Sequence, residues 1–213
     1  MGFDLRVVGL DIVRDLCERH HGYASAGGVA TYAFAVFEER LPIAGYSWHP
    51  PPPGCAKSVC AEAPSGVLAL SRMVAVPKED RLLKHVSKPL REQMHHLVDR
   101  TRWPVLVTFS DEGQGHNGYV YKCAGWEKTE RRRAVVMLDR TGARASRYSN
   151  GKTGGRELVR GADTFIQRWE HWACPRGQAA AWMHEHGWRR MPNGRTYRSG
   201  APAFSWVQEA AHA

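Results

Sequence analysis

The order in which strand-like and helix-like segments follow one another constrains the fold of this chain more than any other feature. Residues 11–20 place apolar side chains at helical spacing, which predicts a helix near the N-terminus. Residues 29–37 and 43–48 are rich in β-branched and aromatic residues and flank a short turn, so they predict an antiparallel hairpin. The prolines at 50–53 remove backbone donors and fix φ, which predicts a stiff loop without regular structure over residues 49–54.

Strand and helix patterns alternate in the second half of the chain. Residues 67–76 have a strong strand pattern, and residues 84–98 have a helical period. Residues 104–109 are a nearly all-apolar run, which is typical of a strand buried on both faces. A short helix over 118–124 and a strand over 133–138 follow. This order implies parallel pairing with helices packed on the sheet, so the predicted fold class is α/β.

The last third of the chain differs from the rest in charge and in tryptophan content. Residues 140–213 contain 12 bases and 5 acids, a net charge of +7, and five of the eight tryptophans, whereas residues 1–139 have a net charge of +2. Basic surface interleaved with aromatic rings is typical of a nucleic-acid contact, and a basic surface around a small tryptophan core is an equally good interpretation. Residues 141–155 predict a loop, residues 163–186 a helical segment, and residues 192–194 a turn. We therefore expect a core domain over 1–139 and a basic, tryptophan-rich, helical extension over 140–213 packed on it.

Several classes of protein are excluded by composition. No apolar run approaches the roughly 20 residues that a membrane span needs, and the N-terminal stretch contains acids and lacks a cleavage site. We therefore expect a cytoplasmic protein without a membrane partner. Five scattered cysteines indicate reduced thiols rather than a disulfide scaffold. Cys55 and Cys60 with His49 fall short of a paired metal signature, so no metal site is predicted, while iron and zinc stay open.

Two segments carry a resemblance to known families. The strand LSRMVAVP at 70–77 and the segment GYVYKCAGW at 118–126 resemble the GNAT acyltransferases. In that fold the fourth strand carries the acyl donor, and a tyrosine in a short helix often protonates the leaving thiolate. The longer pattern VTFSDEGQGHNGYVYKCAGW at 107–126, followed by a basic tail, resembles the Mom-type DNA-modification proteins of bacteriophages. The resemblance implies a GNAT-like mixed sheet flanked by helices as the catalytic core.

The loop after the fourth strand departs from the GNAT pattern. GNAT enzymes usually have Arg/Gln-x-x-Gly-x-Gly/Ala there, and its backbone N–H groups cradle the diphosphate of coenzyme A. Residues 78–88 of this chain contain no glycine, so the close backbone approach that glycine permits is absent. The resemblance still implies donor contacts along this strand and the following helix, at Met73, Val74, Val76, Lys84, Ser87 and Lys88.

The Mom resemblance implies a particular reaction. Mom proteins convert adenine N6 in DNA to a carbamoylmethyl derivative, which protects phage DNA from restriction. Simple acyl transfer makes an N6 amide instead. If the transferred group is glycyl, its free amine can attack ring C6 and displace the amide nitrogen, which gives the carbamoylmethyl base. Two acyl donors are therefore considered, glycyl-tRNA as a hypothesis and acetyl-CoA. With the first of them tRNA is a partner of the protein. The expected acceptor is double-stranded DNA.

The resemblance also marks residues for the chemistry. Asp111 follows a strand, where it is either a base for the N6 proton or the cap of the next turn. Tyr121 is either an acid or a core tyrosine, and Arg72 either binds donor phosphate or forms an ion pair. His116 is either a proton shuttle or an exposed loop histidine. The expected catalytic set is Asp111, Tyr121, Arg72, Ser110 and His116.

A target base inside a duplex must be flipped out before its N6 is reached. GNAT proteins often line the acceptor cleft near the position of residues 20–23. Trp48, Trp188 and Tyr197 are candidates to fill the gap in the duplex, with core packing as the alternative. Arginines of the tail are the expected phosphate contacts. The full expected DNA-binding set is His21, Tyr23, Trp188, Arg189, Arg190, Arg195 and Arg198.

Two other functions are compatible with the sequence. The first is a conventional acetyl-CoA-dependent GNAT N-acetyltransferase, which acetyl-CoA binding would reveal. The second is a non-catalytic DNA-binding module on a GNAT scaffold, for which we expect salt-sensitive DNA binding without a change in base composition. The sequence indicates neither the DNA context nor an oligomeric state.

Overall fold

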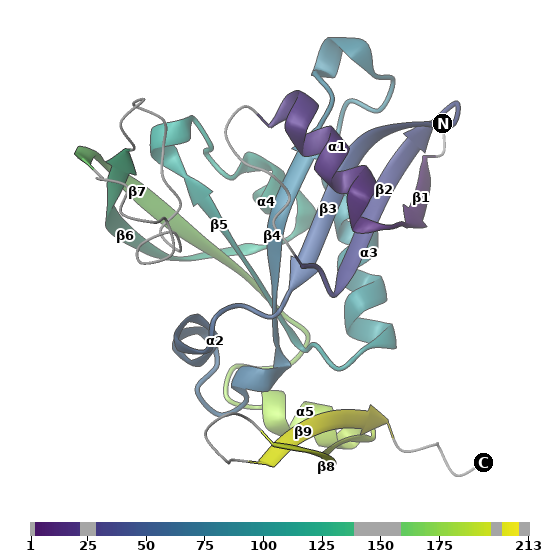
Figure 1. Ribbon diagram of the computed structural model, residues 1–213, viewed down its shortest axis with the longest axis vertical. Helices are drawn as coiled ribbons and strands as arrows, with labels where there is room; N and C mark the ends of the chain where they lie inside the picture. Colours follow the sequence, from purple (N-terminus) through teal and green to yellow (C-terminus); the bar gives the residue numbers. More distant parts are fainter. Residues whose placement is uncertain (1–2, 22–28, 139–158, 197–201, 209–213) are drawn as a thin grey trace. The chain divides into compact units, whose positions relative to one another are not determined.

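The computed structural model describes residues 3–21, 29–138, 159–196 and 202–208, with the backbone alone at 192–196 and 202–205 (Figure 1). Within these residues a seven-stranded sheet has the order β1-β2-β3-β4-β5-β7-β6, and a two-stranded sheet pairs β8 with β9. The strands are β1 (Asp4–Val7), β2 (Tyr32–Glu38), β3 (Leu41–His49), β4 (Val67–Ala75), β5 (Val105–Asp111), β6 (Glu127–Leu138), β7 (Val159–Trp172), β8 (Trp188–Thr196) and β9 (Pro202–Gln208).

Helices and short 3-10 turns connect these strands. The helices are α1 (Leu10–His20), α2 (Pro53–Val59), α3 (Ser87–Arg100), α4 (Tyr119–Ala124) and α5 (Ala179–Glu185), and the 3-10 turns are η1 (Pro64–Gly66), η2 (Lys78–Asp80) and η3 (Glu112–Gln114). None of the described helices is long and apolar enough to span a membrane.

The chain divides into two compact units. The first comprises Met1–His49, Ala69–Gln93 and Val107–His171, and it holds most of the large sheet. The second comprises Pro50–Leu68, Met94–Leu106 and Trp172–Ala213, and it holds the β8–β9 sheet with α2 and α5. Within the second unit, the Ala173 N–H donates to the Pro104 carbonyl over 2.9 Å, which joins two of its distant segments.

The N-terminal half of the large sheet confirms the predicted helix and hairpin. The ladders β1–β2, β2–β3 and β3–β4 are all antiparallel. The turn between β2 and β3 places Glu39 and Arg40 at φ of 48° and 75°, the positive values that a two-residue hairpin turn requires. The strand predicted at 104–109 is β5, and its first four residues are buried.

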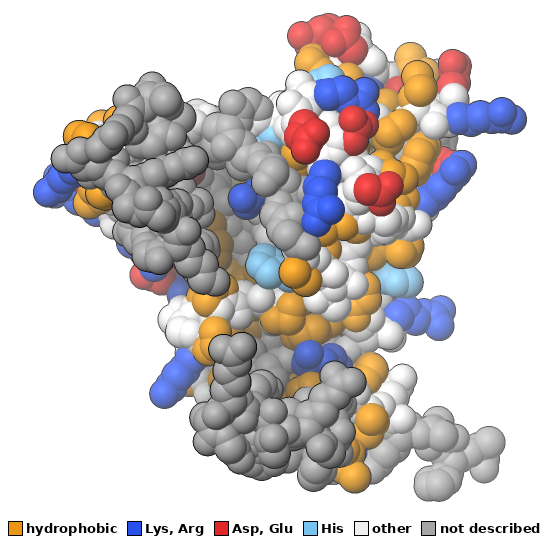
Figure 2. Space-filling view, in the orientation of Figure 1, with side chains coloured by type: hydrophobic (Ala, Val, Ile, Leu, Met, Phe, Trp, Pro, Cys, Tyr) orange, Lys and Arg blue, Asp and Glu red, His pale blue; other side chains and the backbone are white. Residues whose placement is uncertain are grey.

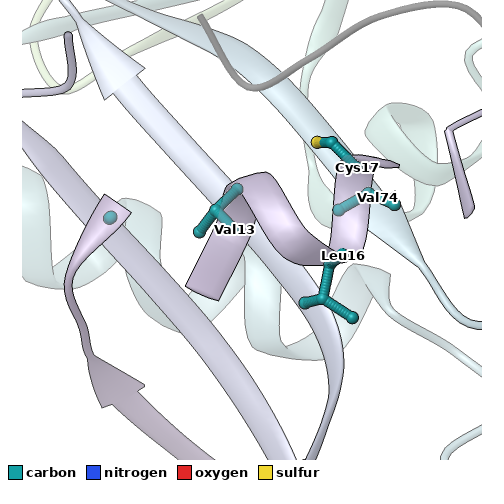
Figure 3. Packing of buried hydrophobic residues seen from close by; sticks show 5 residues of the cluster. Val13, Leu16, Cys17 and Val74 are labelled. Carbon is teal, nitrogen blue, oxygen red and sulfur yellow. The ribbon is translucent and has the colours of Figure 1, made fainter. Parts of the chain in front are cut away.

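The core of the first unit lies between α1 and the sheet. Val13, Leu16 and Cys17 project from one face of α1 and pack with Ala33 and Val74, all of them at most 5% exposed (Figure 3). The sequence folds in this way because these α1 residues recur at a spacing of three and four, which places them on one helix face. The core therefore fixes α1, and with it the residue at its C-terminal end, against β2 and β4.

Shortening Leu16 tests the importance of this core. Leu16 is fully buried, so Leu16→Ala removes apolar contacts and leaves a cavity, and we expect the free energy of unfolding to fall by about 2–5 kcal/mol. The matched control is Leu41→Ala, because Leu41 is 69% exposed and its loss leaves no cavity. Urea denaturation measures the free energy of unfolding of both variants. Equal losses of this free energy in Leu16→Ala and Leu41→Ala would contradict the described packing.

The prediction of a helical segment over 163–186 is wrong for most of its length. Residues up to Trp172 belong to β7, and only Ala179–Glu185 is helical. Gln167 and Trp169, two residues apart, are buried while Arg168 between them is only partly buried, which is the alternation of a strand; Thr164 and Glu170 are buried outside this alternation. Polar side chains at buried positions hid this alternation in the sequence. The part of the C-terminal third that the structure describes is therefore mainly β-structure, and β7 is a strand of the large sheet.

Three further predictions are corrected. β6 does not pair with β5, because β7 lies between them and pairs antiparallel with β6. The turn predicted at 192–194 lies inside β8, where the register with β9 shifts between Pro192 and Thr196. The proline-rich stretch is a loop only as far as Pro52, since Pro53 starts α2, a position where its missing N–H costs nothing. The loop predicted at 141–155 lies outside the described residues.

Candidate functional site

A cavity of about 440 Å³ lies in the first unit, between β4, β5 and the start of α4. Four elements supply its walls: the C-terminal end of α1, the middle of β4, the middle of β5, and the loop that leads into α4. The lining residues are His21, Leu70, Ser71, Arg72, Met73, Thr108, Phe109, Gly115, His116, Asn117, Gly118, Tyr119, Val120 and Tyr121.

An irregularity in β4 shapes the strand side of the cavity. Ser47 of β3 pairs with Arg72, and the next residue of β3, Trp48, pairs with Leu70, so Ser71 is an extra residue on β4. A bulge of this kind bends a strand and redirects its side chains. The Ser71 hydroxyl lies 2.9 Å from the Ser47 hydroxyl, and the Arg72 guanidinium donates to the Ser71 carbonyl over 2.7 Å. The bulge thus places Ser71 and Arg72 together in the cavity wall.

Asp111 stabilises the loop between β5 and α4, which forms the opposite wall of the cavity. Its carboxylate accepts hydrogen bonds from the Gly113 N–H over 3.1 Å and from the Thr164 hydroxyl over 2.6 Å. Its carbonyl accepts one from the His116 N–H over 3.2 Å. The Thr164 hydroxyl also accepts from the Gly113 N–H over 2.8 Å. Asp111 therefore holds both ends of the turn that presents His116 to the cavity.

The loop enters α4 through two glycines. Gly115 and Gly118 have φ of +72° and +71°, values that L side chains rarely adopt. The backbone of Gly118 lies directly against Trp169, because a Cβ there would be 2.3 Å from the Trp169 ring. The Trp169 indole N–H donates to the Ser110 hydroxyl over 2.9 Å, which fixes the ring. The buried Trp169 thus supports the loop from below, and Asn117 caps α4 by accepting from the Tyr119 N–H.

Three of the five expected catalytic residues line the cavity. Arg72, His116 and Tyr121 meet there, and the Tyr121 ring is held between Trp126 and Trp169 at centroid distances of 6.0 and 5.9 Å. Ser110 and Asp111 do not line it. Ser110 accepts the hydrogen bond of the Trp169 indole and Asp111 caps the loop, and the catalytic roles expected of both stay predictions.

The electrostatics of the cavity are those of a basic site. No Asp or Glu is among the described residues that line it, whereas Arg72, His21 and His116 are. The rings of His21 and His116 meet edge to face with centroids 6.4 Å apart. Burial, with smaller contributions from the charges of Arg72 and His116, lowers the pKa of His21 below its ordinary value. The neutral imidazole is therefore the favoured form of His21 at neutral pH, and it is available as a proton acceptor.

This lowered pKa predicts a pH dependence of stability. The unfolded chain binds a proton at His21 near the ordinary value, about 6.5, more tightly than the folded chain does. Stability contributed by the neutral ring is present above that value and is lost as the pH falls through it towards the folded pKa. Urea denaturation at pH 7.5 and 5.5 should show a smaller loss for His21→Gln than for the wild type. Equal losses would contradict the burial of a neutral His21.

The expected donor contacts are divided among several places. Met73 lines the cavity, but the Val74 side chain belongs to the α1 core. Val76 packs at the edge of that core, and its N–H donates to the Ile43 carbonyl over 2.9 Å. Lys84 and Lys88 line a second cavity of about 790 Å³, and Ser87 is the first residue of α3.

The expected DNA contacts are only in part described. Tyr23, Tyr197 and Arg198 lie outside the described residues, and Arg195 is in β8 with its backbone alone described. His21 lines the cavity, whereas the Trp48 candidate is fully buried, donates to the Gln93 amide oxygen and stacks on Trp126. In the second unit Trp188 is half-buried, the Arg189 guanidinium donates to the His184 carbonyl over 2.9 Å, and Arg190 is exposed.

Sequence reasoning missed several residues of the site. Ser71 and Thr108 carry no motif, because a bulge and a sheet position are visible only once strands are paired. Asn117 had a signal, since an Asn side chain often accepts the backbone N–H two residues on and so forms an Asx turn. Among the described residues no group of three or more His, Cys, Asp or Glu is arranged to hold a metal ion.

The sequence matches the Mom protein family over residues 3–164, which is more than half of the chain. The chain belongs to this family. The family match includes every residue that lines the cavity of about 440 Å³. No curated protein matches the chain.

Solved structures of other proteins share the fold of this chain. An N-acetyltransferase from Staphylococcus aureus Mu50 is 9% identical with a TM-score of 0.50, and the match covers 82% of this chain and 100% of that one. The ribosomal-protein-S5-alanine acetyltransferase from Vibrio fischeri is 10% identical with a TM-score of 0.50, over 83% of this chain and 96% of that one. The predicted GNAT-like fold, a mixed sheet flanked by helices, is thus confirmed.

Proposed function

We propose that this chain is a DNA-modifying acyltransferase that converts adenine N6 to its carbamoylmethyl derivative and so protects phage DNA from restriction. The observation that supports it most is the cavity within the Mom-matched part of the chain. It brings Arg72, His116 and Tyr121 together with His21 around a space large enough for a base and a small acyl group. The absence of carboxylates from the described lining leaves the histidines as its proton acceptors.

The first step of the proposed reaction is glycyl transfer. The adenine amine attacks the ester carbonyl of a glycyl donor, the new N6–C bond forms, and the ester C–O bond breaks. The N6 proton passes to a neutral histidine, for which His21 has the suitable lowered pKa. Arg72 stabilises the oxyanion, and the Tyr121 hydroxyl protonates the departing ribose oxygen. This chemistry does not require a carrier of the coenzyme A type, with its diphosphate.

The second step is a rearrangement that needs no further reactant. The glycyl amine attacks ring C6, and the bond between C6 and the original N6 breaks. The released nitrogen becomes the terminal amide, and the glycyl nitrogen becomes the exocyclic nitrogen of the base. All atoms balance, since the product is an isomer of the N6-glycyl adenine. His116 and His21 carry the proton from the attacking amine to the leaving nitrogen.

Double-stranded DNA is the proposed acceptor, and its phosphates meet basic surface outside the cavity. The outer face of α1 carries both signs of charge: Asp11, Asp15 and Glu18 are exposed, Arg19 pairs with Asp15, and Figure 2 shows acidic and basic side chains side by side there. Such a mixed face offers phosphates no concentrated positive charge. The exposed edge strand β6 carries Lys128 and three consecutive arginines, at 131–133, and Arg132 lies 5.9 Å from the ring of Phe109 in the cavity wall. We propose that phosphates flanking the flipped adenine contact this edge.

Donor substitution in a purified system tests the proposal. Duplex DNA is incubated with the protein and either tRNA charged with labelled glycine or labelled acetyl-CoA. The expected result is label in DNA adenine from glycyl-tRNA alone. Label from acetyl-CoA without any tRNA would indicate a conventional acetyltransferase, and salt-sensitive DNA binding without label from either donor would indicate a non-catalytic binding module.

A further inference from the structure

The segment between β4 and α3 already holds an anion, and that anion is part of the chain. The Glu38 carboxylate at the end of β2 accepts two consecutive backbone N–H groups, from Leu82 over 2.8 Å and from Leu83 over 2.5 Å. Both bonds join residues of the first unit. Two adjacent N–H groups that converge on one anion are the arrangement with which a loop binds a phosphate.

Two basic side chains of this segment are also occupied. Arg81 donates through its Nε to the Val76 carbonyl over 2.9 Å and through its Nη1 to the Leu83 carbonyl. The Lys84 ammonium donates to the Lys78 carbonyl over 2.9 Å and to the Arg81 carbonyl. The basic side chains therefore close the loop on itself rather than point at a ligand. The tight hairpin turn after Glu38 fixes the carboxylate, because Glu38 pairs with Leu41 across it.

The fold implies coenzyme A at this loop, and the residues present do not fit it. A diphosphate would have to displace the Glu38 carboxylate from both N–H groups. It would also meet the negative charges of Asp4 and Glu39, which line the same cavity beside Lys84 and Lys88. No glycine in the segment allows the backbone to approach more closely.

We infer that Glu38 replaces the donor diphosphate in this chain, so that the loop after β4 does not bind donors of the coenzyme A type. This inference concerns the donor of the proposed function. It rests on that function in one respect, namely that the proposed donor is an aminoacyl ester, which needs no diphosphate site at this loop. Glu38 then has a positioning role, since it orders the segment that leads into α3.

Ligand binding to the full chain, without DNA, tests this inference. Isothermal titration with coenzyme A and with inorganic diphosphate is compared for the wild type, Glu38→Ala, Glu38→Gln and Glu39→Gln. The wild type should show no saturable binding of either ligand. Freeing the two N–H groups in Glu38→Ala should create diphosphate binding at least roughly tenfold tighter than in the wild type. Glu38→Gln removes the charge but keeps the shape of the side chain. It replaces Glu38→Ala in this measurement if Glu38→Ala does not fold.

Glu39→Gln is the matched control, because it removes the same charge from the same turn and leaves the Leu82 and Leu83 contacts in place. Saturable diphosphate binding should still be absent from this variant, because both N–H groups stay occupied although one repulsive charge is gone. Micromolar binding of coenzyme A by the wild type would overturn the inference. Equal gains for the Glu38 and Glu39 variants, or no gain in either Glu38 variant, would also overturn it. These outcomes do not depend on whether the chain modifies DNA, so they are separate from failure of the proposed function.

Discussion

Gly118→Ala should lower the free energy of unfolding by about 2–5 kcal/mol and abolish modification of DNA. Two costs combine at this position. The left-handed conformation, at φ of +71°, costs an L side chain about 1–2 kcal/mol. The new Cβ would also lie within 2.3 to 2.6 Å of three atoms of the buried Trp169 ring, and overpacking of this kind costs about 1–3 kcal/mol.

The chain offers a matched control at Gly115. Gly115 has nearly the same φ, +72°, but a Cβ there would have nothing within 4 Å. Gly115→Ala should therefore show only the conformational cost in stability, about 1–2 kcal/mol. Urea denaturation and a modification assay on both variants separate the two costs. Equal destabilisation would show that Trp169 does not support the loop as described.

Arg72→Gln should lower the rate of adenine modification by about a hundredfold or more, with little loss of stability. Arg72 is the arginine among the described cavity residues, and no carboxylate in that lining offsets its charge. A positive charge beside a developing oxyanion in such a site contributes about 10²–10³ in rate. The control is Arg19→Gln, which removes an exposed arginine from α1 and breaks only its surface pair with Asp15.

Arg72→Gln carries a second expectation that a purely structural arginine would not produce. The charge of Arg72 helps to lower the pKa of His21, so its removal should raise that pKa. If His21 accepts the proton, the acidic limb of the rate–pH profile then moves to higher pH in Arg72→Gln. A loss of rate with an unmoved limb would assign the proton transfer to another group.

The sequence predicted the local parts of this site well. Gly118 and Gly125 mark the start and end of α4 because glycine is needed at positive φ, and that requirement is visible in the sequence. The pattern around Arg72 predicted β4, since β-branched and apolar residues there suit a buried strand. The residues that form the cavity wall on β4 and α4 were therefore largely accessible to sequence reasoning.

The parts of the site that depend on contacts between residues far apart in the chain could not be predicted from the sequence. Asp111 follows a strand, and its sequence position does not distinguish a catalytic base from a cap; the structure shows the contacts of a cap, among them the hydrogen bond from Thr164, far along the chain, and the role as a base stays a prediction. Glu38 meets the Leu82 and Leu83 amides across more than 40 residues, and no local pattern predicts this. Trp169 was assigned to a helix because the polar buried residues of β7 concealed the alternation of a strand.

The most direct test of the proposed function is mass spectrometry of nucleosides from plasmid DNA of cells that express this protein, beside cells that express Arg72→Gln. We expect a deoxyadenosine heavier by one glycyl residue in the wild type, absent from the variant. Alkaline hydrolysis then separates the two isomers, because an N6-glycyl amide returns deoxyadenosine whereas the carbamoylmethyl nucleoside becomes a carboxymethyl one. A carboxymethyl product would confirm the rearranged modification; an acetylated nucleoside, or unmodified DNA despite good soluble expression, would contradict it.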